Sequence, residues 1–150
     1  MHTVHRLTLE DALIMLTAAE EEARRIGVKQ TICIADDGAH PIAVHRMTGA
    51  RLTGVEIAIA KAFTAAGHQR DTHKFNEPPN GPALPGNEAF GIDQMHPGKF
   101  AIFVGGFPIV HEGEVVGAVG VSGGNGDQDK AVGAAALRAF KEKVAVSAQG

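Results

Sequence analysis

The sequence predicts an α+β fold in which a five-stranded, mostly antiparallel sheet is packed with helices. Three segments place apolar residues at helical spacing, and five short runs have the composition of strands bounded by turns. Along the chain the order is helix, two strands, helix, loop, three strands, helix. Runs of strands followed by helices favour an antiparallel sheet with the helices packed on it. The length of 150 residues is most simply one domain, residues 1–150.

The three predicted helices follow from capping signals and apolar stripes. Thr8 is a good N-cap, and acidic residues follow it in the first turn, where the helix dipole favours them. This first helix ends near Gly27. The second helix is expected over residues 52–68 and the third over residues 127–146. The side chains expected to face the core from the second helix are Leu52, Val55, Ile59, Ala62, Phe63 and Ala66.

The predicted strands fall into two groups separated by a long loop. Residues 31–36 and 41–47 form the first group. Residues 99–104 form the third strand, and a hairpin with its turn at Glu112-Gly113 supplies the fourth and fifth. Between the groups, residues 71–98 contain five of the seven prolines. A loop of this length inside a compact domain is usually functional or disordered.

The second strand of the hairpin has the most informative pattern in the chain. Gly117 and Gly120 leave one side of it nearly bare, so another backbone or a flat ligand can approach closely. The strand ends in the run Ser-Gly-Gly-Asn-Gly at residues 122–126, directly before the last helix. Such a strand-to-helix turn offers free backbone N–H groups, which predicts a cradle for an anion.

Composition argues against several classes of partner. The formal net charge is −3, and no predicted face gathers Lys and Arg, so nucleic acid is not expected. No apolar run approaches the ~20 residues that a membrane-spanning helix needs, so no membrane partner is expected. Cys33 is the only cysteine. An internal disulfide and a multi-cysteine zinc site are therefore excluded, and a reducing, cytoplasmic location fits best.

The histidine spacing predicts no metal site built from protein side chains alone. His40 and His45 are five residues apart on one strand and therefore face opposite sides. No His-x-x-x-His or Glu-x-x-His pair occurs on a predicted helix. We expect His111 to be exposed at the hairpin tip and His5 to lie in a frayed N-terminal tail.

Five short motifs follow one another in a recognisable order. They are the opening helix at residues 7–12, Arg-Met-Thr-Gly-Ala at 46–50, Lys-Ala-Phe-Thr-Ala at 61–65, the glycine-rich hairpin at 105–123, and Gln128-Asp129. Together they resemble the GlcG/HbpS family, which includes the C-terminal domain of PduO-type proteins. Thr48 stands where that family usually has Asp. The resemblance extends from Leu7 to about Phe140.

The resemblance implies a small domain with a five-stranded antiparallel sheet that assembles into a homo-oligomer. It also implies a small flat or anionic ligand, with heme or a related tetrapyrrole as the leading candidate. Many members of the family lie among genes of small-molecule catabolism. The strand with almost no side chains and the Ala-rich helices favour an oligomer independently, because they allow close packing between subunits.

Candidate ligand residues lie in three parts of the chain. Lys61, Thr64 and His68 are spaced i, i+3, i+7 and share one face of the second helix, which can hold a carboxylate or can be an ordinary solvated face. Arg46 is a carboxylate anchor because its guanidinium pairs bidentately. In the heme interpretation His68 or His96 approaches the iron, and the cations bind the propionates. The remaining candidates are Gly105, Gly106, Ser122, Gly123 and Gly124.

A second interpretation is an enzyme that moves a proton on a small carboxylate or carbonyl compound. Glu88 and His96 then serve as acid and base from the Pro-rich loop, with Asp129 as a further candidate. Arg46 and Lys61 clamp the substrate. The alternatives are an ordinary polar loop and, for Asp129, a carboxylate that stabilises the helix N-terminus. A third interpretation is an accessory protein whose oligomeric surface is its function.

Overall fold

The computed structural model describes residues 1–149. The described chain forms three α-helices, four strands and two short 3-10 turns. No helix among these residues is both long enough and apolar enough to cross a membrane. In chain order the elements are α1 (Leu9–Arg25), β1 (Thr31–Asp36), β2 (Pro41–Arg46), α2 (Gly54–His68), η1 (Thr72–Phe75), η2 (Ile92–Gln94), β3 (Gly106–His111), β4 (Glu114–Ser122) and α3 (Gly126–Gln149).

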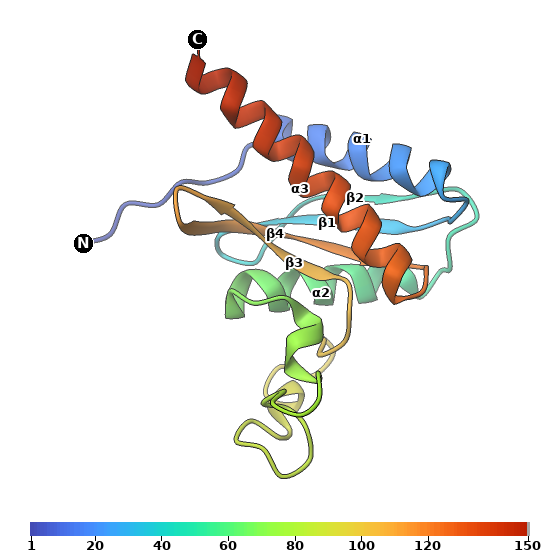
Figure 1. Ribbon diagram of the computed structural model, residues 1–150, viewed down its shortest axis with the longest axis vertical. Coiled ribbons are helices and arrows are strands. Elements are labelled where there is room, and N and C mark those ends of the chain that lie inside the picture. Colours follow the sequence, from blue (N-terminus) through green and yellow to red (C-terminus); the bar gives the residue numbers. More distant parts are fainter. Residues whose placement is uncertain (150) are drawn as a thin grey trace.

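The strands form one antiparallel sheet in the order β2-β1-β4-β3. Helices α1 and α3 cover one face of this sheet, and α2 covers the other (Figure 1). The segment between α2 and β3 projects beyond α2, away from the sheet. The predicted α+β class, antiparallel pairing and helix packing are therefore confirmed. The prediction of five strands is wrong, because the sheet of the described chain has four.

Residues 99–104, the expected third strand, do not pair with the sheet. Their backbone polar groups form hydrogen bonds with threonine side chains instead. The N–H of Ala101 donates to Thr64 Oγ1 at 2.8 Å, and the Thr72 hydroxyl donates to the carbonyl of Phe103 at 2.6 Å. Buried backbone groups need a partner, and here helix α2 and turn η1 supply it. The apolar run is therefore an irregular segment held against α2 and η1.

The two faces of the sheet differ in side-chain size. The face toward α1 and α3 carries large apolar residues such as Ile32 and Val121, whereas small residues such as Cys33 and Ala118 face α2. Gly120 lies on the small face, where an added Cβ would overlap the carbonyl oxygen of Ala58 and lie 2.7 Å from the amide of Ala62. At Gly120, β4 therefore accommodates the backbone of a helix rather than a flat ligand. Gly117 lies on the opposite face, beside Leu7, so the expectation that the two glycines leave one side bare is wrong.

Because the sheet face toward α2 carries small residues, the buried side of α2 differs from the predicted one. Leu52 was expected in the core, but it precedes the helix and is 78% exposed. Val55, Ile59 and Phe63 are only partly buried. A helix that approaches glycine and alanine this closely buries its own small residues, so the side chains that α2 buries are Ala58, Lys61, Ala62, Thr64, Ala65 and Ala66.

Helix α1 begins where its capping residues predict. Thr8 and Asp11 form a reciprocal capping box, and the Lys143 ammonium of α3 also contacts the Asp11 carboxylate. Burial alone would raise the pKa of Asp11, but the hydrogen bonds from Lys143 and Thr8 outweigh it and lower that pKa below its ordinary value. The two helices on this face are therefore joined by a pair that stays ionised at neutral pH.

Candidate functional site

Two of the predicted site residues form an ion pair in the interior. Lys61 of α2 and Asp129 in the first turn of α3 place Nζ and Oδ2 3.2 Å apart, with only 3% and 4% of their side chains exposed. The Lys61 ammonium also donates to the carbonyl oxygen of Val121 at 2.7 Å. The pair therefore joins α2, β4 and α3 at one buried point.

The second carboxylate oxygen of Asp129 closes the glycine-rich turn. Its Oδ1 accepts from Gln30 Nε2 at 2.7 Å and from the N–H of Gly124 at 3.1 Å. At Gly124 the anion on this turn is the chain's own carboxylate and not that of a ligand. Ser122 is buried at the end of β4, and a Cβ on Gly123 would lie 2.7 Å from the carbonyl oxygen of Lys29.

The glycines before β3 pack against the same lysine. A Cβ on Gly105 would lie 2.6 Å from Lys61 Nζ, and one on Gly106 would overlap the carbonyl oxygen of Lys61. Burial lowers the pKa of the Lys61 ammonium and raises the pKa of the Asp129 carboxyl, while their mutual attraction opposes both shifts. The structure thus assembles Lys61, Asp129 and the two glycine runs into one cluster closed by protein atoms.

Thr64 and His68 do not share one exposed ligand-binding face with Lys61. The Thr64 hydroxyl donates to the carbonyl of Ala60 at 2.8 Å and accepts from Ala101, so its polar contacts are within the chain. His68, at the last turn of α2, is exposed. The spacing correctly places the three residues on α2, but packing encloses two of them.

The two candidate iron ligands, His68 and His96, lie on one aromatic group. Both contact Phe100, with ring centroids 5.9 Å from Phe100 for His68 and 6.3 Å for His96, and the His96 ring is nearly parallel to it at 10°. His68 also packs on Phe75, and His96 on Phe63. Both imidazoles are exposed. We call these five residues the aromatic–imidazole cluster.

An apolar pocket adjoins the aromatic–imidazole cluster and shares Phe63 with it. The pocket has a volume of about 300 Å³ and lies between α2, the β1–β2 turn and Gly98-Lys99. Its apolar lining includes Pro41 and Ile59, and exposed Lys99 stands at its edge. Pockets that bind small molecules combine such apolar walls with a few polar groups.

Arg46 belongs to a different site, a cleft of about 730 Å³ between the end of α1 and strand β2. We call it the basic cleft, because Arg24 and Lys29 line it together with Arg46. It also contains a short hydrogen-bonded pair, in which His45 Nδ1 lies 2.5 Å from Glu20 Oε1. Sequence spacing gives no sign of this pair, because its members are 25 residues apart, on a helix and a strand.

The structure does not join the residues of the predicted acid–base pair. Glu88 and His96 are both exposed in the segment between α2 and β3. Among residues 1–149, no hydrogen bond or ion pair links Glu88 to His96, and none links Arg46 to Lys61. Cys33 is fully buried in β1, and burial raises the pKa of its thiol to about 12, so a reactive thiolate is not formed at neutral pH.

Comparison with known proteins identifies relatives across the chain. A family model described as "Haem degrading protein HbpS-like" matches residues 7–138. The 15.0 kDa protein of the dhaT-dhaS intergenic region of Citrobacter freundii is 34% identical over 136 residues, which covers 91% of this chain and 93% of that protein.

Two solved structures are similar in fold. The crystal structure of the Klebsiella pneumoniae protein ORFY has a TM-score of 0.88 at 30% identity and covers 94% of both chains. The crystal structure of a PduOC:heme complex has a TM-score of 0.83 at 29% identity and covers 90% of this chain and 95% of the other. The fold described above is therefore shared with these two proteins over 94% and 90% of this chain.

Proposed function

The chain belongs to the HbpS-like family, and from that premise we propose that it binds heme or a related tetrapyrrole at the aromatic–imidazole cluster. The similar PduOC structure is a heme complex, which supports this class of ligand. The observation that carries the choice of site is the contact of two exposed imidazoles, His68 and His96, with the same ring, Phe100, next to an apolar pocket.

The residues at the aromatic–imidazole cluster fit the chemistry of heme. Heme needs an axial ligand, apolar or aromatic contact for the porphyrin, and cations for the propionates. His68 or His96 would ligate the iron, and the ring of Phe100 would contact the porphyrin. Lys99 at the pocket edge and Arg70, whose guanidinium lies 5.1 Å from the centroid of the Phe75 ring, would bind the propionates. Bound heme would supply iron for redox chemistry or for binding a small ligand.

We include self-association and a cytoplasmic location in this proposal. The small sheet face that suggested close packing between subunits is covered by α2 of the same chain, so the interface must use another surface. Leu9 and Leu13 of α1 are 55% and 41% exposed and lie one helical turn apart, which supports α1 as part of it. A chain that buries a lone cysteine suits a reducing compartment.

A hemin titration followed by absorbance tests the heme proposal. We expect a sharpened, shifted Soret band that saturates at one heme per one or two subunits, with light scattering on the same sample giving the subunit number. His68→Ala or His96→Ala should weaken binding about tenfold or more, because loss of a metal ligand removes a coordinate bond. His73→Ala, which changes a histidine outside the cluster, is the matched control. A titration that does not saturate would reject this site. So would a heme affinity in both His68→Ala and His96→Ala that equals the affinity of the wild type.

The basic cleft supports a second candidate function, proton transfer on a small carboxylate. Arg24, Lys29 and Arg46 provide positive charge for an anionic group. The carboxylate of Glu20 orients the His45 imidazole at 2.5 Å, an arrangement typical of a general base. In this alternative the acid–base groups are His45 and Glu20 rather than Glu88 and His96.

Calorimetric titration with succinate, malonate and inorganic phosphate tests the basic cleft. We expect one of these anions to bind with a dissociation constant in the millimolar range or below, and Arg46→Ala to weaken it about tenfold, the effect of losing one charge-assisted contact. Arg25→Ala, at the end of α1 but outside the cleft, should have no effect. If the Arg46 and Arg25 variants behave alike, the cleft does not bind these anions.

A further inference from the structure

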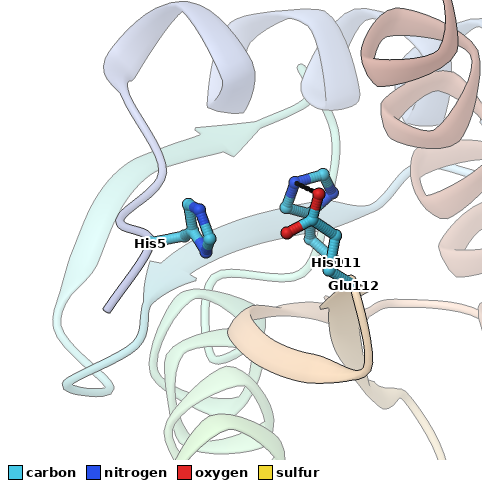
Figure 2. Close-up of side chains that lie close together, drawn as sticks. All are labelled: His5, His111 and Glu112. Carbon is cyan, nitrogen blue, oxygen red and sulfur yellow. Dashed lines mark ion pairs between the residues drawn. The ribbon is translucent and has the colours of Figure 1, made fainter. Parts of the chain in front are cut away.

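Three potential metal ligands from separate parts of the chain meet at the end of the sheet. They are His5 of the N-terminal segment, His111 at the end of β3, and Glu112 of the β3–β4 turn (Figure 2). One ligand atom from each residue lies within 4.8 Å of the other two. The imidazole rings of His5 and His111 meet edge to face with centroids 5.3 Å apart, and His111 Nε2 is 3.8 Å from Glu112 Oε1. We call this group the His-His-Glu cluster.

The β3–β4 turn holds two members of the His-His-Glu cluster in place. Glu112 and Gly113 have φ values of 50° and 80°, the left-handed pair typical of a tight hairpin turn. The His111 ring packs edge-on against Phe140 of α3, with centroids 6.2 Å apart. This contact makes His111 half-buried, and the neighbouring Glu112 carboxylate stays exposed.

His5 is held close to the other two ligands by the residues that follow it. Arg6 forms a bidentate pair with Asp37, at 2.7 Å and 3.1 Å, and Leu7 is 8% exposed in the main core. His5 lies one residue from this ion pair and two from a core contact, which limits its distance from the sheet. The imidazole itself stays exposed and can reorient.

The donor set matches that of a transition-metal site. Two imidazoles and one carboxylate are the protein ligands of open zinc sites, which keep a further position for water. Zn–N bonds of 2.0–2.1 Å at a tetrahedral angle require donors roughly 3.3 Å apart. The ligand atoms now lie within 4.8 Å of one another. Rotation of the exposed side chains of His5 and Glu112 can bring them to the shorter distance.

The Glu112 carboxylate is exposed and available to a metal ion. Among residues 1–149, neither Lys nor Arg forms an ion pair with Glu112. The charged groups nearest in sequence to His5 and in the adjoining pocket, Arg6 and Asp11, are already paired with Asp37 and Lys143. The Glu112 carboxylate therefore lies beside two imidazoles and has no Lys or Arg partner among residues 1–149, a donor set that suits a divalent cation.

We propose that the His-His-Glu cluster binds one divalent first-row transition ion, with Zn²⁺ as the representative, and that the ion fastens the N-terminal segment to the β3–β4 turn. Imidazole-rich sites of this kind suit Zn²⁺, Ni²⁺ and Cu²⁺ rather than Mg²⁺ or Ca²⁺. This site shares no residue with the aromatic–imidazole cluster, so it stands independently of heme binding.

Calorimetric titration of tag-free, heme-free protein with ZnCl₂ tests the proposal. We expect one Zn²⁺ per chain, with affinity reduced about tenfold or more in both His5→Ala and His111→Ala. His45→Ala is the matched control, because His45 also contacts a carboxylate, that of Glu20, but belongs to no group of three potential ligands among residues 1–149. Equal Zn²⁺ affinity in wild type and in both test variants would overturn the site.

A second measurement distinguishes loss of the metal site from misfolding of a variant. Zn²⁺ should raise the melting temperature of the wild type and slow amide exchange at residues 1–7, because a ligand that binds only the folded state stabilises it. His5→Ala removes an exposed side chain, so its melting temperature without metal should equal that of wild type. Unchanged amide exchange at residues 1–7 on Zn²⁺ addition would overturn the fastening role.

Discussion

Gly120→Ala is expected to lower the free energy of unfolding by about 3 kcal/mol, at the upper end of overpacking costs. The new methyl group would overlap the Ala58 carbonyl oxygen and approach the Ala62 amide to 2.7 Å. Both are backbone atoms of α2, so no side-chain rotation relieves the overlap, and the helix must move off the sheet. Urea unfolding followed by circular dichroism measures the loss in this protein, which has no Trp or Tyr.

Gly67→Ala provides the control for Gly120→Ala within the same layer of the molecule. A Cβ at Gly67, near the end of α2, meets no atom within 4 Å. Alanine has the higher helix propensity, so this variant should gain roughly 0.5–1 kcal/mol. If both glycine variants were equally stable, the close approach of α2 to β4 would be refuted.

Lys61→Met is expected to cost about 3–5 kcal/mol, because it leaves the Asp129 carboxylate buried without its counter-ion. Methionine keeps most of the lysine's length, so the loss reports the charge rather than a cavity. The same unfolding experiment measures it. Arg25→Met, which breaks an exposed pair with Glu22, should leave the free energy of unfolding nearly unchanged.

Two further measurements attribute the loss in Lys61→Met to the buried carboxylate. The double variant Lys61→Met/Asp129→Asn should recover part of the stability, since asparagine still accepts from Gln30 and Gly124. Burial raises the pKa of Asp129, and removing Lys61 removes the attraction that opposes this rise. The folded state then keeps a proton that the unfolded carboxyl releases above about pH 3.9.

The sign of the pH dependence follows from this proton. Where the folded state binds more protons than the unfolded state, stability falls as pH rises. The deficit of Lys61→Met relative to wild type should therefore shrink as pH is lowered from 7 toward 4. A deficit that is the same at both pH values would show that the variant loses packing and not charge compensation.

Elements whose structure depends on local contacts were predictable from the sequence. The cap at Thr8, the start of α3 and the hairpin turn at Glu112-Gly113 all depend on residues within four positions of one another. Capping hydrogen bonds and a turn with two positive φ values are satisfied inside such short segments. The sequence motifs also identified the family, which the family model confirms.

The candidate site was predictable in its members but not in its grouping. Helical spacing placed Lys61, Thr64 and His68 on α2, yet only packing decides that Lys61 meets Asp129, 68 residues away, while His68 stays exposed. Packing also decides that His96 and His68 contact the same ring, Phe100. Spacing along one element carries no information about contacts made between elements.

The sequence by itself determined the helices, the hairpin, the α+β class and the family, because these follow from short-range propensity and from the order of motifs. Tertiary structure alone decided that residues 99–104 leave the sheet, since Thr64 and Thr72 bind their backbone groups. It also decided the burial of α2 and the meeting of His5 with His111. Each of these depends on which atoms distant in sequence compete for the same space or the same hydrogen bond, and that competition exists only once the chain is folded.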